Sequence, residues 1–309
     1  MEFEKEIIKF DEMEEKRMLK FLKVINSINV NTLNNIRKEI DIIYSNYSKN
    51  GVLDIVEINK FNRMDKFKTY ISEQINESYK NFNSQQREFM KNLFFENYYY
   101  FLYLISYNSD TLVVPDKLKN DNFKSNYEND QTGVSTKERI DKNKLITNDR
   151  IISSVVGGMI AGLGVNAVKN RLKTSIEQDY NIKKRMFETK ENEIRNKSRE
   201  NAFIKASSKV DLLKVWVATL DTRTRRSHRD LDGTTLKINQ KFKGKFGEGL
   251  SPSRMNDPRE NINCRCRLAY VYDKKSLEDS QRIERNPDTR RNTIGKYQTY
   301  EQYKKYYKL

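Results

Sequence analysis

Three side chains have the chemistry of metal ligands or nucleophiles: the only histidine, His228, and the only two cysteines, Cys264 and Cys266. An imidazole and two thiolates are good ligands for Zn²⁺. A histidine among arginines and lysines could instead support acid–base cleavage of nucleic acid. A third interpretation is structural, because a buried histidine can bond to Asp221 or to the backbone while small thiols fill the core. The residues alone leave all three interpretations open.

Each interpretation requires further residues, and the sequence provides those of some interpretations but not of others. Catalysis lacks a second base, an acidic cluster of the two-metal type and a phosphate-binding loop. A structural zinc site takes four ligands, so Asp221 or Asp232 would have to complete a set of three. The structural interpretation expects arginines to pair with nearby aspartates, namely Arg223, Arg225, Arg265 and Arg267 with Asp221, Asp230 and Asp232. Two cysteines one residue apart cannot form a disulfide framework, which fits synthesis in a reducing cytoplasm.

The charge of the chain points to a polyanionic partner. The net charge is +16, and residues 201–309 carry 25 Lys and Arg against 13 Asp and Glu, a net +12. Such a surface favours nucleic acid first and an anionic membrane second. We expect DNA contact from eight cationic residues: Arg223, Arg225, Arg226, Lys241, Lys243, Lys245, Arg265 and Arg267.

The elements that must position these residues read as a small α+β domain. Residues 212–220 are apolar and β-branched enough for a buried strand, and 236–238 is a short second candidate. Residues 265–272 alternate, which places Cys266, Leu268 and Tyr270 on one face of a third strand. Asp232-Gly233 suits a turn with positive φ. We therefore expect a helical N-terminal half followed by a small domain with a short antiparallel sheet.

The rest of the chain is predicted mainly from periodicity and composition. The aromatic run at 82–107 is typical of core or of a protein interface. Residues 151–168 carry no charge but hold several glycines, so we expect a buried or interface helix rather than a membrane span. Five segments result: a helical docking region at 1–108, a polar linker at 109–149, a glycine-rich helix and a charged connecting helix at 150–210, the α+β domain at 211–275, and a basic, tyrosine-rich tail at 276–309.

Residues 214–268 resemble the phage head morphogenesis family typified by protein F of phage Mu. The resemblance rests on an ordered series of residues: Trp216, Asp221, Arg223, Arg225, His228, Leu231, Asp232, Gly233, Phe242, Phe246, Gly249, Pro252, Asn263, Cys264, Arg265 and Cys266. The clear resemblance covers about 150–275, and residues 1–149 share only helical character with the family. Of the residues in the series we take Trp216, Asp221, Asp232, Gly233 and Asn263 to be structural. In many relatives the same region resembles a more complete zinc site. They carry Cys-x-x-Cys where this chain has Arg225 to His228, and a histidine at the position of Asn261.

The resemblance implies a minor head protein of a tailed bacteriophage, a virion component in the capsid interior that is assembled in the host cytoplasm. It implies portal, capsid and scaffold proteins as partners, together with packaged double-stranded DNA, and no cofactor other than a possible Zn²⁺. From the charge and the helical pattern we expect an adaptor whose helical half docks on protein while the basic domain lies against DNA without reading its sequence. Two alternatives remain: a nuclease or toxin-like enzyme using His228, and an ejected protein acting on the host membrane through 151–168.

Overall fold

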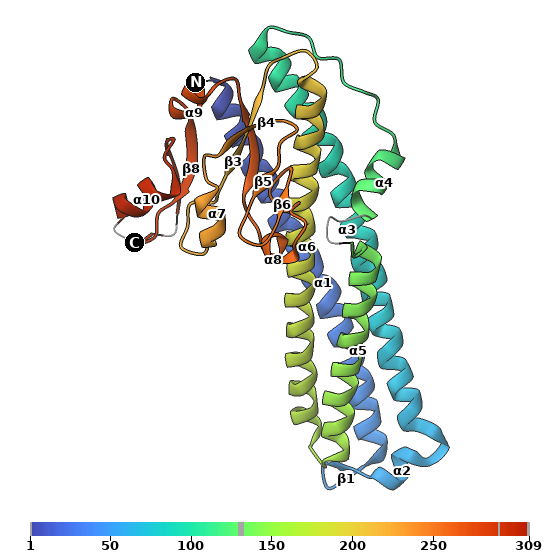
Figure 1. The fold of residues 1–309 in the computed structure, drawn as a ribbon. Coiled ribbons are helices and arrows are strands. Elements are labelled where there is room, and N and C mark those ends of the chain that lie inside the picture. The colour runs from blue at the N-terminus through green and yellow to red at the C-terminus, as the bar shows by residue number, and fades with distance from the viewer. Residues whose placement is uncertain (1, 129–132, 290, 308–309) are drawn as a thin grey trace. The chain divides into compact units, whose positions relative to one another are not determined.

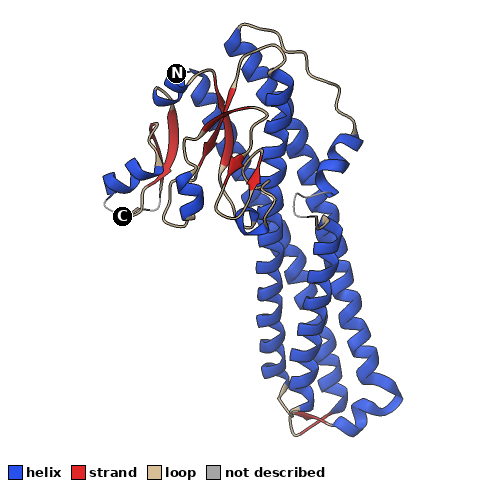
Figure 2. Ribbon diagram, in the orientation of Figure 1, coloured by secondary structure: helices blue, strands red, loops and turns tan. Residues whose placement is uncertain are grey.

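The structure, a computed structural model, describes residues 2–128, 133–289 and 291–307 (Figure 1). The chain forms two compact units, each assembled from separate segments. Unit 1 comprises Met1–Lys16, Glu88–Ser135 and Phe187–Leu309, and unit 2 comprises Arg17–Arg87 and Thr136–Met186. Figure 2 shows long helices together with short strands, and all named strands except β1 and β2 follow the last long helix, which ends at Ala206; this confirms the predicted α+β class.

Unit 2 is a bundle built from parts of four helices, which lie side by side in Figure 1: α1 (Glu2–Tyr47), α3 (Arg63–Ser109), α5 (Thr136–Ile160) and α6 (Val165–Ala206). Their apolar residues recur three or four positions apart, so each helix turns one stripe toward the core. Ile36 and Ile40 of α1, for example, are fully buried with Ile71 of α3, Ile151 of α5 and Val168 of α6.

Short elements join the helices of unit 2. Between α1 and α3 lie the strand pair β1 (Ser48–Lys49) and β2 (Val52–Leu53), helix α2 (Ile55–Asn59) and the 3-10 turn η1 (Lys60–Asn62). The carboxylate of Asp54 caps α2 by accepting from the amides of Val56 and Glu57. The uncharged stretch 151–168 does not form one helix: α5 ends at Ile160 and α6 starts at Val165. Gly162, at φ +75, takes the left-handed conformation that ends helices.

A fully buried polar network crosses the core of unit 2. The Lys183 ammonium donates to Asp179 Oδ2 at 2.7 Å, to Asn29 Oδ1 at 2.9 Å and to Ser78 Oγ at 2.6 Å. The other oxygen of Asp179 accepts from the hydroxyls of Tyr79 and Thr147. Burial lowers the pKa of Lys183, although the charge and hydrogen bond of Asp179 oppose the shift. All four helices contribute, so the network fixes their register in the bundle.

The segment expected to be a polar linker, 109–149, instead contains helix. Helix α4 covers Asn120–Glu128, and α5 already begins at Thr136. Phe123 and Tyr127, four residues apart, are buried on one face of α4, and Ile140 is buried on α5. Composition predicted a loop here because polar residues outnumber these apolar ones, yet a few buried side chains suffice to hold each helix in place.

Unit 1 contains the predicted antiparallel sheet. Strands β3 (Leu213–Val217), β4 (Thr235–Lys237) and β7 (Arg267–Val271) pair in the order β4-β3-β7, with Trp216 opposite Leu268. Both of these side chains are fully buried. They pack in one core with Phe101 of α3 and Phe203 of α6, which belong to the same unit.

The polar face of α6 in unit 1 is buried against the sheet. The amide of Asn192 donates to the carbonyls of Cys264 and Cys266, and Asn196 accepts from the backbone N–H of Leu268 at 2.7 Å. Arg199 is 1% exposed, beside Asn97 of α3 and Asp11 of α1. The expected connecting helix is therefore part of the core of this unit.

The remaining elements of unit 1 are short, and they reach into the tail. They are α7 (Arg226–Asp230), β5 (Phe242–Lys243), β6 (Glu248–Gly249), α8 (Pro258–Asn261), α9 (Lys274–Glu278), the hairpin β8 (Gln281–Arg285) with β9 (Asn292–Lys296), and α10 (Tyr300–Tyr307). Tyr300 and Tyr303 are buried against Leu220. Within the described residues, no helix combines the length and apolarity needed to cross a membrane.

Candidate functional site

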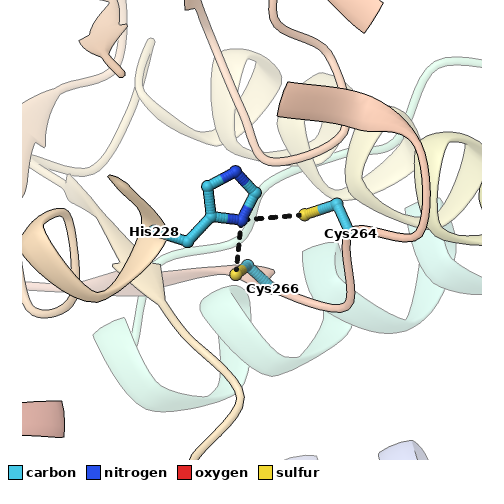
Figure 3. A group of neighbouring side chains, drawn as sticks. All are labelled: His228, Cys264 and Cys266. Atoms are coloured by element: carbon cyan, nitrogen blue, oxygen red, sulfur yellow. Dashed lines mark hydrogen bonds between the residues drawn. The ribbon is translucent and has the colours of Figure 1, made fainter. Parts of the chain in front are cut away.

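The structure brings His228, Cys264 and Cys266 together as a buried group, here called the His–Cys cluster (Figure 3). Helix α7 carries the histidine, and both cysteines lie in the approach to β7. Nδ1 of His228 is 3.6 Å from Sγ of Cys264 and 3.4 Å from Sγ of Cys266. All three side chains are at most 3% exposed. The two dashed contacts in Figure 3 therefore converge on one ring nitrogen.

The other ring nitrogen of His228 is held by a carboxylate. Nε2 lies 2.9 Å from Oε2 of Glu260, which is fully buried at the end of α8. The same carboxylate accepts from the hydroxyl of Ser227 at 3.1 Å and from the backbone N–H of Phe246 at 2.9 Å. The sequence did not indicate Glu260, because its contact with His228 joins two short helices, α7 and α8, and the two residues lie 32 positions apart in the chain.

The two aspartates considered as a fourth ligand or as a partner of His228 are engaged elsewhere, so that prediction is wrong. The carboxylate of Asp221 accepts from the Arg265 guanidinium and from the N–H of Arg223. The carboxylate of Asp232 accepts from Arg282 at 2.9 Å and from the N–H of Ala218 at 2.8 Å. Both residues close turns of the domain instead of facing the His–Cys cluster.

The protonation states in the His–Cys cluster follow from its geometry. Burial alone would lower the pKa of His228, but the hydrogen bond and charge of Cys264, with the Glu260 carboxylate, raise it. Burial would raise the pKa of Cys264, but hydrogen bonds from Cys266 and His228 lower it well below the ordinary value. Burial and the neighbouring Cys264 raise the pKa of Cys266. These shifts act in one sense, since they favour a proton on His228 and on Cys266 and loss of the proton from Cys264.

The same atoms fit a zinc ion. Zinc bonds of about 2.3 Å to sulfur and about 2.05 Å to nitrogen, at a tetrahedral angle, separate N from S by roughly 3.5 Å. The two N–S distances here bracket that value. Histidines that bind metals commonly donate their second N–H to a carboxylate, which is the position of Glu260. Three ligands of this set would hold the metal, and a fourth would come from outside the cluster.

The geometry does not favour catalysis by His228. A general base must reach a substrate proton with a free ring nitrogen. Here Nδ1 faces two sulfurs, Nε2 contacts Glu260, and the side chain is 2% exposed. A role in holding the domain together, with or without a metal, suits the cluster better.

The five residues taken to be structural surround the cluster or form turns near it. The ring of Trp216 is fully buried and meets the ring of His228 edge to face at 5.3 Å. Gly233, at φ +76, donates to the carbonyl of Trp216. Asn263, at φ +57, donates its N–H to the hydroxyl of Thr189 on α6. Asp221 and Asp232 bond to arginines as described above.

The eight cations expected at DNA divide into two groups. Arg225 donates to the carbonyls of Glu260 and Ile262, Arg265 pairs with Asp221, and Arg267 pairs with Asp11 at 3.2 Å. Burial alone would raise the pKa of Asp11, but the charges of Arg199 and Arg267 lower it to about 2. These three arginines hold the fold. The other five are exposed: Arg223, Arg226, Lys241, Lys243 and Lys245.

A pocket of about 490 Å³ gathers three of the exposed cations. It is lined by Arg226, Ser227, Asp230, Leu231, Lys243, Gly244 and Lys245. The lining residues come from α7 and from β5 with the turn that follows it. We call this the basic pocket.

Comparisons with known proteins agree with the motif at 214–268. Residues 149–269 match the family described as phage Mu protein F like protein. The chain is 26% identical to minor head protein GP7 of Bacillus phage SPP1 over 252 residues, which cover 81% of this chain and 82% of that protein. It is also 23% identical to the NAD(+)–arginine ADP-ribosyltransferase EFV of Enterococcus faecalis over 185 residues, 59% of this chain but 38% of that enzyme. No solved structure matched the chain.

Proposed function

We propose that this chain, whose residues 149–269 match the phage Mu protein F-like family and which is similar to a phage minor head protein, acts as an adaptor in head assembly. In this proposal the helical region at 1–108 docks on portal, capsid or scaffold protein. The basic region at 211–309 lies against packaged double-stranded DNA in the capsid interior. The role is structural rather than enzymatic.

The observation that carries the DNA part is the charge of residues 201–309, a net +12 with five of the eight expected cations exposed. Exposed lysines and arginines neutralise phosphates without reading bases, and binding of this kind weakens steeply with salt. The non-enzymatic part is supported by the engagement of both ring nitrogens of His228. The match to the ADP-ribosyltransferase leaves most of that enzyme's length uncovered.

A binding titration of the full chain against mixed-sequence duplex DNA tests the DNA part. We expect sequence-independent binding whose log Kd rises linearly with log salt concentration, with a slope of about 0.9 for each phosphate contacted. A duplex of equal length and different base composition serves as the control and should bind equally. Absence of binding, or binding that salt does not weaken, would contradict the proposal.

Crosslinking and mass spectrometry of purified particles test the docking part. We expect crosslinks from lysines of 1–108 to portal, capsid or scaffold protein, and from lysines of 211–309 to DNA. A protein that is missing from the particle and from its assembly intermediates would refute the adaptor role.

A further inference from the structure

Most cations of the α+β domain are already engaged by partners within unit 1. Lys241 pairs with Glu248, Arg254 with Glu200 and Arg259 with Asp257. Arg225 and Arg229 donate to backbone carbonyls. Across residues 213–268, all of which the structure describes, four Lys and Arg side chains make no hydrogen bond or ion pair: Arg226, Lys237, Lys243 and Lys245. Three of these four line the basic pocket.

The walls of the basic pocket are held together by Glu260. Its carboxylate accepts from Ser227 on the α7 side and from the N–H of Phe246 on the side of the turn after β5. A Cβ on Gly244 would lie 2.8 Å from Oε1 of Glu260, so the turn packs directly on that carboxylate. Glu260 in turn contacts the buried His228. The unpaired cations therefore stand on a fixed frame, which lowers the entropy lost when a ligand binds.

The lining of the pocket suits a phosphate rather than a base. Three cations against one carboxylate, Asp230, leave a net charge of +2 around the cavity. No aromatic side chain lines it, and the nearby ring of Phe246 is covered by Arg259 at 4.2 Å and Lys245 at 5.0 Å. Stacking on a base, which single-strand binders use, is thus not offered here. Phosphate contacts fix position without reading sequence.

We propose that the basic pocket seats a phosphate of the DNA backbone and is the anchor of the DNA contact. This inference rests on the proposed function, because it assigns the DNA contact to one place on the domain. It differs from a diffuse basic surface in one respect: the three cations of the pocket contribute more to DNA affinity than any other three of equal exposure.

The test compares two triple variants of the full chain by fluorescence anisotropy with duplex DNA over a range of salt concentrations. The pocket variant carries Arg226→Gln, Lys243→Gln and Lys245→Gln. The control carries Lys237→Gln, Lys296→Gln and Lys304→Gln, which removes the same charge from exposed positions outside the pocket. We expect the pocket variant to lose at least about tenfold in affinity and to lower the salt slope by about 0.9 per lost phosphate contact. The control should lose less than about threefold.

A third variant keeps the test independent of folding defects. Asp230→Asn removes the one carboxylate of the pocket lining and should tighten DNA binding by about two- to fivefold, which a misfolded protein would not do. Equal losses of DNA affinity in the two triple variants, or no gain of affinity from Asp230→Asn, would overturn the assignment to the pocket. The proposed function would still stand in that case, provided that the wild-type chain binds DNA. Failure of the wild-type chain to bind DNA would overturn both.

Discussion

Removing the buried Lys183 ammonium should destabilise unit 2 more than any change on its surface. The substitution Lys183→Met keeps an unbranched side chain, one heavy atom shorter, but leaves the Asp179 carboxylate without its counter-charge. The side chains of Lys183 and Asp179 are 0% and 1% exposed. Solvent therefore cannot replace the lost ion pair.

The expected magnitude follows from what remains around Asp179. Its carboxylate keeps the hydroxyls of Tyr79 and Thr147 and the amide of Asn29 as donors. These donors reduce the cost of the buried charge but do not neutralise it. Loss of one partner from a buried ion pair costs about 3–5 kcal/mol of unfolding free energy. In the double variant Lys183→Met with Asp179→Asn no net charge stays buried, so its cost should fall short of the sum of the single variants by about 2 kcal/mol.

Native-state hydrogen exchange of the full chain, read by mass spectrometry for residues 17–87 and 136–186, measures the change where it occurs. Lys173→Met is the matched control, because that lysine is 56% exposed and its ion pair with Glu177 is long, at 3.8 Å. Its effect should stay within about 0.5 kcal/mol. A loss below about 1 kcal/mol for Lys183→Met, or strict additivity in the double variant, would refute the reasoning.

Three further outcomes are expected. Burial lowers the pKa of Lys214 to about 8, against roughly 10.4 in an unfolded chain. Between these pH values the unfolded chain binds more protons at Lys214 than the folded chain, so the unfolding free energy of the wild type should rise with pH. The unfolding free energy of Lys214→Met, measured in urea, should exceed that of the wild type by less as pH rises through this range. A difference in unfolding free energy that does not change with pH would contradict the expectation. If the His–Cys cluster holds zinc, elemental analysis should find about one Zn²⁺ per chain, and Cys266→Ser should lose it; a metal-free wild type purified with zinc would exclude the site. Finally, Gly249→Ala places a Cβ 2.2 Å from the backbone oxygen of Arg254 and should lower the unfolding free energy by about 1–3 kcal/mol. The control Gly157→Ala, which meets nothing within 4 Å on an exposed helical position, should raise it by about 0.5–1 kcal/mol, and equal effects of the two would contradict the packing argument.

The strands of unit 1 could be predicted because their burial is written in the sequence. The apolar run at 212–220 and the alternation at 265–272 contain β3 and β7, and the buried face of β7 is the one expected. The strand order β4-β3-β7 was not predicted, since it depends on pairing across long stretches of chain. The helix break at 161–164 was missed for a local reason: glycines favour close helix packing and helix ends alike, and only Gly162 adopts the positive φ.

Polar residues were the harder part of the prediction. His228, Cys264 and Cys266 could be grouped because they are the only histidine and the only cysteines of the chain. Their carboxylate partner could not be predicted, because nothing in the sequence distinguishes Glu260 from Asp221 or Asp232 as the one that contacts His228. Helix α6 was expected to be a charged connecting helix, yet its residues Asn192 and Asn196 bond to backbone groups at and beside β7. Hydrophobic periodicity assigns every polar side chain to solvent, so it fails wherever polar groups serve as the core. The same limit hid which arginines hold the fold and which are free.

The order of segments in the two units has a consequence for synthesis on the ribosome. Unit 2 is complete once residue 186 has been made, whereas unit 1 joins residues near both ends of the chain, as in the pairing of Asp11 with Arg267. Domains fold as units during synthesis, and extension from residue 187 to 267 takes roughly 4–16 seconds at 5–20 residues per second. For that time Phe10 and Tyr98 lack the sheet side of the core that buries them in the finished unit. A nascent chain stalled before β7 would thus carry a folded unit 2 and an incomplete unit 1 with exposed apolar side chains, and we expect chaperones and proteases to bind it preferentially.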